Sequence, residues 1–157
     1  MSTLTIYSAT DIKIINDVIA NRDLIVLGGG LLAAETAANL LMKQKSNKIK
    51  SSTIIMREKE PLAEMYGEKI GKVIRGRMEE LGVKIISGSN MIDSDKNSIH
   101  LANGTKISHK GALVVNAVGT FLGDIGHNNI LDRLTVENNS IITNDFGQTG
   151  QGPRFTD

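Results

Sequence analysis

The sequence predicts a three-layer α/β domain whose central sheet is parallel. Short, mostly apolar runs recur at residues 24–27, 52–56, 83–86 and 113–118, as is typical of strands covered on both faces. Stretches with helical spacing of apolar residues separate the first three runs. Strands that alternate with helices in this way form βαβ units, and these build a parallel sheet.

The first 22 residues predict a lead-in segment with one short helix. Thr10 and Asp11 are residues that often begin a helix. Four apolar residues follow at helical spacing, which gives an amphipathic helix that ends near Asn21. The four are Ile12, Ile15, Val18 and Ile19.

The run at 24–27 ends in three glycines and is followed by a helical stretch at 31–43. Within it, Gly28, Gly30 and Ala33 fit the pattern G-x-G-x-x-G/A in the strand-turn-helix context that the pattern requires. The first position permits a tight turn, the second lets a pyrophosphate approach the backbone, and the third lets the helix pack close to its strand. The helix N-terminus offers free N–H groups to phosphates. A Rossmann-like dinucleotide-binding domain is therefore predicted, with Gly28, Gly29, Gly30, Leu31, Leu32 and Ala33 at the ligand.

The run at 52–56 ends at Met56-Arg57, where a residue of this fold meets the adenosine ribose. A helix is predicted over 64–81, with Gly82 as its stop. Its apolar positions predict one packing face, and Arg75 and Arg77 are expected outside. The expected packing residues are Ile70, Val73, Ile74, Met78 and Leu81, while Gly71 and Gly76 weaken the intrinsic helix propensity.

A small antiparallel hairpin or meander is expected beside the sheet, because Asn103-Gly104 joins strand-like runs at 98–101 and 105–107. The run at 113–118 ends at Gly119, a second place where backbone can approach a ligand. These patterns predict three regions. They are a lead-in helix at 1–22, a dinucleotide-binding domain at 23–110, and C-terminal strands at 111–157.

Composition excludes several classes of function. The 157 residues carry a net charge of +1, and only 3% are aromatic, so no nucleic-acid partner is expected. The chain has no cysteine, which excludes a disulfide framework, a thiolate metal site and a cysteine nucleophile. No apolar run is as long as a membrane span, and residues 1–20 do not resemble a signal peptide, so we expect a cytoplasmic protein.

The sequence contains no residue pattern that indicates metal binding or acid–base catalysis. His100, His109 and His127 share no ligand spacing, so no metal site is predicted. No nucleophile motif accompanies them, so no catalytic residue is assigned.

The glycine motif and Glu35 stand in a longer series of segments. Glu80-Leu-Gly-Val-Lys-Ile follows the second long helix, and Leu101-Ala-Asn-Gly-Thr-Lys-Ile follows as a hairpin. Leu113 to Gly119 ends in Ala-x-Gly, and a segment at 141–149 completes the series. In this order the segments resemble the pyridine-nucleotide domain of the FAD-dependent pyridine nucleotide-disulfide oxidoreductases. The residues of the glycine turn resemble those of the NADH oxidases and of the nitrite reductase large subunit.

The resemblance implies the NAD(P)H-binding domain of a flavin-dependent oxidoreductase, which presents the nicotinamide for hydride transfer to FAD. Glu35 has a family counterpart near the nicotinamide and flavin, and its other interpretation is an exposed helix residue. Gly119 corresponds to a position beside the nicotinamide. The chain lacks the family's second glycine fingerprint, so we expect FAD in the full-length enzyme to bind a separate FAD domain, in cis or in trans. The C-terminal strands resemble the return into that FAD domain.

The corner at Met56-Arg57 bears on the choice between NAD and NADP. Members of the family that prefer NAD carry an acid at this position, whereas here an apolar residue and an arginine stand in its place. An arginine fork suits a 2′-phosphate, so the sequence favours NADPH. The alternative is that Glu58 takes the acidic role in a shifted loop.

A second class of function stays open. The chain also fits a stand-alone NAD(P)(H)-binding sensor or regulatory module without catalysis. Flavin absorbance in the purified chain would distinguish a working flavoenzyme from both a domain fragment and a sensor. A homo-oligomer is left open, and no membrane partner is expected.

Overall fold

The computed structural model of the chain describes residues 3–6, 8–42, 49–119, 136–137 and 140–149. The chain forms two compact units, Met1–Gly119 and Thr120–Asp157. No helix within the described ranges is long and apolar enough to cross a membrane. The first unit contains the predicted sheet and all of the predicted site residues.

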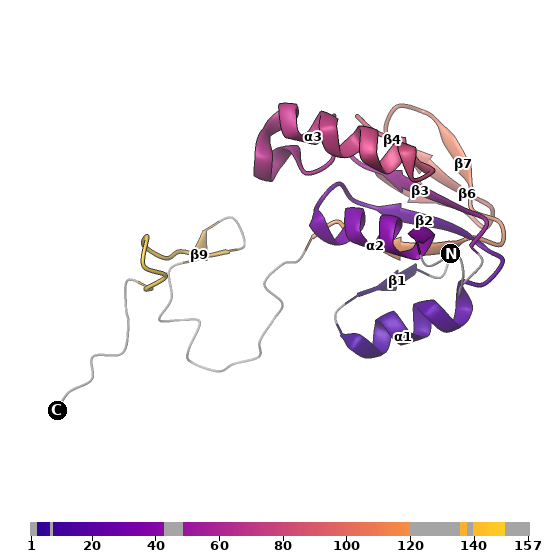
Figure 1. Cartoon of the computed structure of the whole chain (residues 1–157), viewed down its shortest axis with the longest axis horizontal. Helices are drawn as coiled ribbons and strands as arrows, with labels where there is room; N and C mark the ends of the chain where they lie inside the picture. The colour runs from indigo at the N-terminus through magenta and orange to yellow at the C-terminus, as the bar shows by residue number, and fades with distance from the viewer. Residues whose placement is uncertain (1–2, 7, 43–48, 120–135, 138–139, 150–157) are drawn as a thin grey trace. The chain divides into compact units, whose positions relative to one another are not determined.

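The first unit is built on a five-stranded sheet in which every neighbouring pair of strands is parallel (Figure 1). In spatial order the strands are β1 (Thr3–Thr5), β8 (Leu113–Asn116), β2 (Asp23–Leu27), β3 (Ser51–Ile55) and β4 (Val83–Ile86). The predicted parallel sheet is therefore confirmed. The lead-in segment adds an edge strand, and β8 lies between that strand and β2, so both belong to the same compact unit as residues 23–110.

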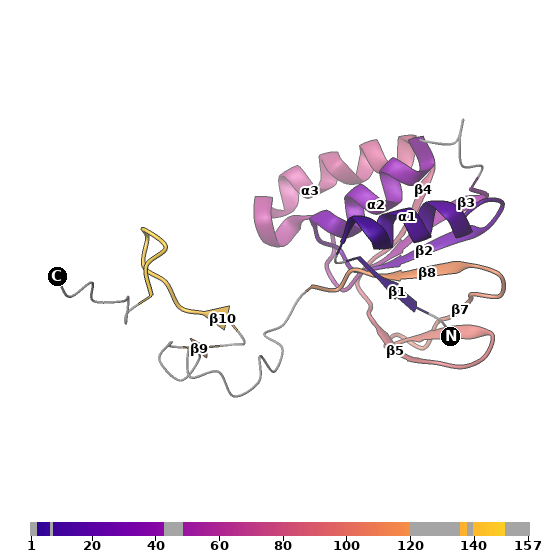
Figure 2. The same ribbon diagram turned by 90° about the horizontal axis from the view of Figure 1, so that it is seen from below.

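Three layers are present, as predicted. Three helices cover one face of the sheet, and an antiparallel meander lies on the opposite face (Figures 1 and 2). The helices are α1 (Ala9–Val18), α2 (Leu31–Met42) and α3 (Ala63–Glu80), and the meander consists of β5 (Met91–Ser94), β6 (Ser98–Leu101) and β7 (Lys106–Ser108).

Alternation along the strands explains why both faces are covered. In β2, Leu24 and Val26 pack in the core beneath the helices, whereas Ile25 and Leu27 pack against the meander. All four side chains are at most 4% exposed. A strand that buries every residue must be apolar throughout, which is why the sequence pattern predicted a central parallel strand.

Helix α1 begins earlier than the sequence predicted, because its cap is Ser8 rather than Thr10 or Asp11. The Asp11 amide donates to Ser8 Oγ at 3.4 Å, and the Ser8 amide donates to Asp11 Oδ2 at 2.8 Å. This reciprocal pair is a capping box, which satisfies two N–H groups that the helix leaves free.

The turn between β5 and β6 is organised by one carboxylate. Asp95 Oδ1 accepts the Asn97 and Ser98 amides at 2.7 and 2.8 Å, and Asp95 Oδ2 lies 2.8 Å from His100 Nε2. These bonds, the Asn97 amide first, lower the pKa of Asp95 to about 2. The carboxylate is therefore ionised at any pH at which the protein would be studied.

The packing face of α3 differs from the sequence prediction. Ile70, Val73 and Leu81 were expected in the core but are 50%, 66% and 45% exposed. Met78 is buried and Ile74 partly buried, as predicted, and Gly71 is buried in addition. Two glycines cause the difference. Gly67 has φ of +79° and ψ of 162°, which interrupts the helix and changes the phase of the residues after it. Gly71 then lets the loop before the helix pack directly against the helix backbone.

The second unit contains a short antiparallel pair, β9 (Val136–Glu137) and β10 (Ser140–Ile141). A single bridge joins Thr143 to Thr149. Of the predicted C-terminal region 111–157, residues 120–135, 138–139 and 150–157 lie outside the described residues.

Two of the glycines in α3, Gly71 and Gly76, predict opposite effects of the same substitution. A Cβ at Gly71 would lie 2.7 Å from Glu60 Cβ and 2.9 Å from the Pro61 carbonyl oxygen, whereas a Cβ at Gly76 would meet nothing within 4 Å. We expect Gly76→Ala to raise the free energy of unfolding by about 1 kcal/mol through helix propensity. Gly71→Ala should lower it, because overpacking costs about 1–3 kcal/mol and exceeds that gain.

Thermal and urea unfolding of the two variants would measure the difference. Equal stabilisation by both substitutions would show that the loop does not pack against α3 at Gly71.

Candidate functional site

The candidate site lies at the carboxyl ends of β2 and β8. The strand order of the sheet reverses between these two strands, which makes this place a topological switch point. Strands β2, β3 and β4 follow one another on one side, whereas β8 lies on the other side of β2. The Ala117 amide donates to the Leu27 carbonyl oxygen at 2.8 Å, and the Gly28 amide donates to the Ile55 carbonyl oxygen at 2.8 Å. In open α/β sheets, ligands bind in the crevice outside the strand ends at such a switch point.

Gly28 is required by its backbone and by its neighbour. Its φ is +124°, a conformation that side chains strongly disfavour. A Cβ there would lie 2.3 Å from the Ala117 carbonyl oxygen. The sequence assigned this glycine to a tight turn, and the structure adds the close approach of the chain that leaves β8.

Gly29 and Gly30 face different surroundings. A Cβ at Gly29 would lie 2.5 Å from Glu58 Oε2 and 3.1 Å from Met56 Cβ, so the ribose corner closes against this residue. A Cβ at Gly30 would meet nothing within 4 Å. The Ala34 amide donates to the Gly30 carbonyl oxygen at 3.1 Å, so α2 begins here with exposed backbone just after the end of β2. This open backbone is where an anion can approach the helix N-terminus.

The first turns of α2 combine a buried small residue with exposed apolar ones. Ala33 is fully buried in the core between the helix and the sheet, which agrees with its predicted packing role. Leu31 and Leu32 are 45% and 40% exposed, and Glu35 is also exposed. Large exposed apolar side chains that lie together are typical of a surface that a ligand or another domain covers.

The ribose corner contains one buried and two charged residues. The Met56 side chain is 1% exposed and lies beneath the glycine turn. The Arg57 side chain is 69% exposed, and its Nη2 lies 3.0 Å from Glu58 Oε1 and 2.6 Å from Glu64 Oε1. The charge of Glu58, followed by its hydrogen bond and then by Glu64, raises the pKa of Arg57. Of the two charged side chains, that of Glu58 lies against Gly29.

Backbone hydrogen bonds hold this corner in place. The Leu62 amide donates to the Gly29 carbonyl oxygen at 2.9 Å, and Leu62 itself has φ of +59°. The Gly88 and Ser89 amides donate to the carbonyl oxygens of Glu58 and Met56, each at 3.2 Å. A leucine in the left-handed region is unusual, and such strain occurs often at functional loops.

Gly119 is the last residue of the first unit and follows β8 by three residues. It has φ of +114°, is exposed, and has no neighbour within 4 Å of an added Cβ. Val118, just before it, is 70% exposed. The open backbone that the sequence predicted here is therefore present.

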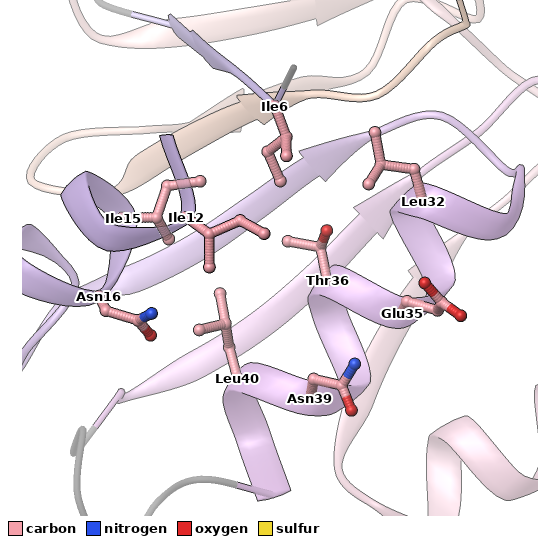
Figure 3. Close-up of a pocket in the computed structure, with 9 residues that line it drawn as sticks. All are labelled: Ile6, Ile12, Ile15, Asn16, Leu32, Glu35, Thr36, Asn39 and Leu40. Carbon is pink, nitrogen blue, oxygen red and sulfur yellow. The ribbon is translucent and has the colours of Figure 1, made fainter. Parts of the chain in front are cut away.

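A cavity of about 190 Å³ lies between α1 and α2, close to the end of β1 (Figure 3). Its walls are mostly apolar, and Glu35 contributes one carboxylate. The lining residues are Ile6, Ile12, Ile15, Asn16, Leu32, Glu35, Thr36, Asn39 and Leu40. Ordinary pockets for drug-sized ligands measure about 300–1,000 Å³, so this hollow is too small to hold a dinucleotide.

Comparison with protein families identifies the chain. Residues 3–153 match the model of the pyridine nucleotide-disulphide oxidoreductase family. The chain belongs to this family. No curated protein sequence matches the chain significantly.

Solved structures with the same fold include reductases and an oxidase. The reductase in a covalent putidaredoxin reductase–putidaredoxin complex is 21% identical with a TM-score of 0.69, over 94% of this chain and 35% of that chain. An engineered water-forming NADPH oxidase bound to NADPH is 17% identical with a TM-score of 0.67, over 95% of this chain and 32% of that one. A ferredoxin reductase from Rhodopseudomonas palustris is 17% identical with a TM-score of 0.61, over 74% of this chain and 28% of that chain. The chain thus spans about a third of these proteins.

Sequence reasoning about this family member found the glycine turn but gave too little weight to two contacts. Glu58 was only the alternative at the ribose corner, and its contact with Gly29 joins two segments that no local pattern brings together. The contact of Ala117 with Gly28 joins segments far apart in sequence. The small residue at 117, just before Gly119, was the one available signal for it.

Metal ligands do not gather at the site. Within the part of the chain that the structure describes, no group of three or more His, Asp or Glu side chains could hold a metal ion. His100 and His109 both contact Asp95 in the meander, through its carboxylate and its carbonyl oxygen respectively.

The glycine turn of this family member predicts two different responses to alanine. Gly28→Ala should lower the free energy of unfolding by at least about 1–3 kcal/mol, because a left-handed φ is combined with a backbone clash. Gly30→Ala should leave it within about 0.5 kcal/mol of the wild type, as is usual for surface positions. Urea unfolding followed by circular dichroism would measure both, and a large loss for Gly30→Ala would contradict the open backbone at that residue.

Proposed function

We propose that this chain is the NAD(P)H-binding domain of a flavin-dependent oxidoreductase and presents the nicotinamide for hydride transfer to FAD. The observation that carries the proposal is the open backbone of Gly30 at the start of α2, at the switch point of the sheet. Family membership and the reductase fold support an oxidoreductase. The flavin would supply the electron chemistry, and this chain would supply binding and orientation.

Each wall of the crevice has a role in this proposal. The amides at the start of α2 would bind the pyrophosphate, because they point out of the helix N-terminus and carry its positive dipole end. The corner after β3 would hold the adenosine ribose beside Gly29. Gly119 and the exposed Glu35 would face the nicotinamide, where Glu35 orients the ring and excludes water.

The FAD domain would cover the exposed apolar side chains around the crevice. Leu31, Leu32 and Val118 are 45%, 40% and 70% exposed, which is unfavourable for a surface that remains in water. Glu35 adds a carboxylate on the same helix, which could pair with a cation of the docked domain. Because the chain spans only a third of its structural neighbours, that domain is proposed to act in cis or in trans.

Binding of the nucleotide is the direct test. We expect the purified chain to bind NADH or NADPH, seen as enhanced nicotinamide fluorescence or as heat in calorimetry. Gly30→Ala should weaken binding by about tenfold or more, since a methyl group would stand where the pyrophosphate approaches and each lost charge-assisted bond is worth about 1.5–3 kcal/mol. A stable wild-type chain that binds neither nucleotide would rule the proposal out.

The ribose corner supports NADH more than NADPH. The sequence favoured NADPH because of Arg57, but Arg57 Nη2 already contacts two carboxylates, those of Glu58 and Glu64. A 2′-phosphate on Arg57 would have to displace them and remain near their charges. Glu58 Oε2, in contrast, lies against Gly29, where a carboxylate can accept bonds from ribose hydroxyls. We therefore propose that Glu58 performs the acidic role and that NADH is preferred.

Two neighbouring substitutions separate the alternatives. Glu58→Gln should weaken NADH binding by about tenfold, because a charge-assisted hydrogen bond is lost. The ratio of NADH affinity to NADPH affinity should fall accordingly. Arg57→Ala should leave NADH binding unchanged, and Lys59→Ala controls for the loss of one positive charge. Titrations of all three with both nucleotides would measure this. NADPH binding that exceeds NADH binding and disappears in Arg57→Ala would support the NADPH alternative instead.

A further inference from the structure

The loop between β3 and α3, residues 56–62, is held from behind by one side chain. Arg75, on α3, donates from Nε to Glu60 Oε2 at 2.6 Å and from Nη2 to the Lys59 carbonyl oxygen at 2.6 Å. The same Nη2 lies 3.0 Å from Ser87 Oγ, at the end of β4. One guanidinium thus joins the loop, the helix and the neighbouring strand.

Burial distinguishes this arginine from the others on α3. Its side chain is 21% exposed, and that of its partner Glu60 is 9% exposed. Arg77, two residues further along, is 76% exposed and pairs only with Glu80 on the same helix. A paired charge that is removed from water holds its geometry, whereas exposed pairs exchange readily with solvent.

A continuous series of contacts runs from Arg75 to the glycine turn. Glu60 and Pro61 pack against the bare backbone of Gly71, which fixes the loop on the helix. Leu62 then takes its left-handed conformation, and its amide donates to the Gly29 carbonyl oxygen at 2.9 Å. The other end of the loop presents Glu58 to Gly29. The position of the ribose corner relative to the glycine turn therefore depends on Arg75.

We propose that Arg75 is a positioning residue for dinucleotide binding, and that it sets the discrimination between NADH and NADPH by fixing the loop that carries Arg57 and Glu58. The inference rests on the proposed function of the glycine turn. Arg75 touches no ligand in this proposal. It acts through Glu60 and the Lys59 carbonyl oxygen, which hold the loop at a defined distance from Gly29.

The ratio of the NADH and NADPH affinities distinguishes two roles of Arg75. In one role it positions the loop, and in the other it only stabilises the folded protein. If a substitution merely lowers the folded population, both affinities fall by the same factor and their ratio is unchanged. If the loop moves, the groups that read the 2′ position are displaced, and the ratio approaches one. The preferred nucleotide of the wild type does not matter to this reasoning.

Arg75→Lys is the informative variant, because it keeps the charge but cannot form the fork. We expect the wild-type preference, about tenfold for one charge-assisted hydrogen bond, to fall to within about twofold. Arg77→Lys on the same helix is the matched control and should retain the wild-type ratio. Titrations with NADH and NADPH at a temperature where all three proteins are folded would measure the ratios.

Amide hydrogen exchange gives a second readout that needs no nucleotide. Exchange at Leu62 and Gly88, whose amides bond to Gly29 and Glu58, should be faster in Arg75→Lys than in Arg77→Lys. Exchange at Val26, in the centre of the sheet, should not change. An unchanged affinity ratio in Arg75→Lys, or a wild type without preference, overturns the positioning role. A wild type that binds neither nucleotide overturns the proposed function itself.

Discussion

The contact between Gly28 and the chain that leaves β8 is the constraint on which the site depends. Because a Cβ at Gly28 would lie 2.3 Å from the Ala117 carbonyl oxygen, only glycine allows the ends of β2 and β8 to approach this closely. The Ala117 amide completes the approach with its bond to the Leu27 carbonyl oxygen. The next residue, Gly29, accepts the Leu62 amide from the third segment. One turn of three glycines therefore brings three distant parts of the chain to one crevice.

Two arginines that look alike in sequence contribute differently to that crevice. Arg57 and Arg75 each contact two carboxylates, but Arg57 is 69% exposed and Arg75 is 21% exposed. Surface ion pairs add little stability, because solvent screens them and both side chains must be ordered. A partly buried pair resists rearrangement, since separation would leave a charge without water or partner. Arg75 can therefore define the loop, whereas the exposed ion pairs of Arg57 contribute little to holding it.

The parts of the fold governed by local rules could be predicted from the sequence. Strand β2 needs apolar residues on both faces, and the glycine turn and Ala33 obey requirements that a short pattern expresses. The packing face of α3 could be predicted only in part: Met78 is buried as expected, but Gly67 changes the phase of the helix and Gly71 is buried by a loop rather than by the sheet. The contact of the Glu58 carboxylate with Gly29 could not be predicted either, since it joins segments that are distant in sequence.

The loop from Met56 to Leu62 divides its residues between two tasks. Met56, Glu60, Pro61 and Leu62 are buried and fix the backbone, whereas Arg57 and Lys59 are exposed and Glu58 is partly so. The residues that would read the 2′ position of a nucleotide are thus separate from those that maintain the fold. Substitutions among the three outer residues change charge without creating a cavity or leaving a buried group unpaired, and such surface changes usually alter stability by only about 0.5 kcal/mol. The charge of this outer surface can therefore change while the architecture of the domain is retained.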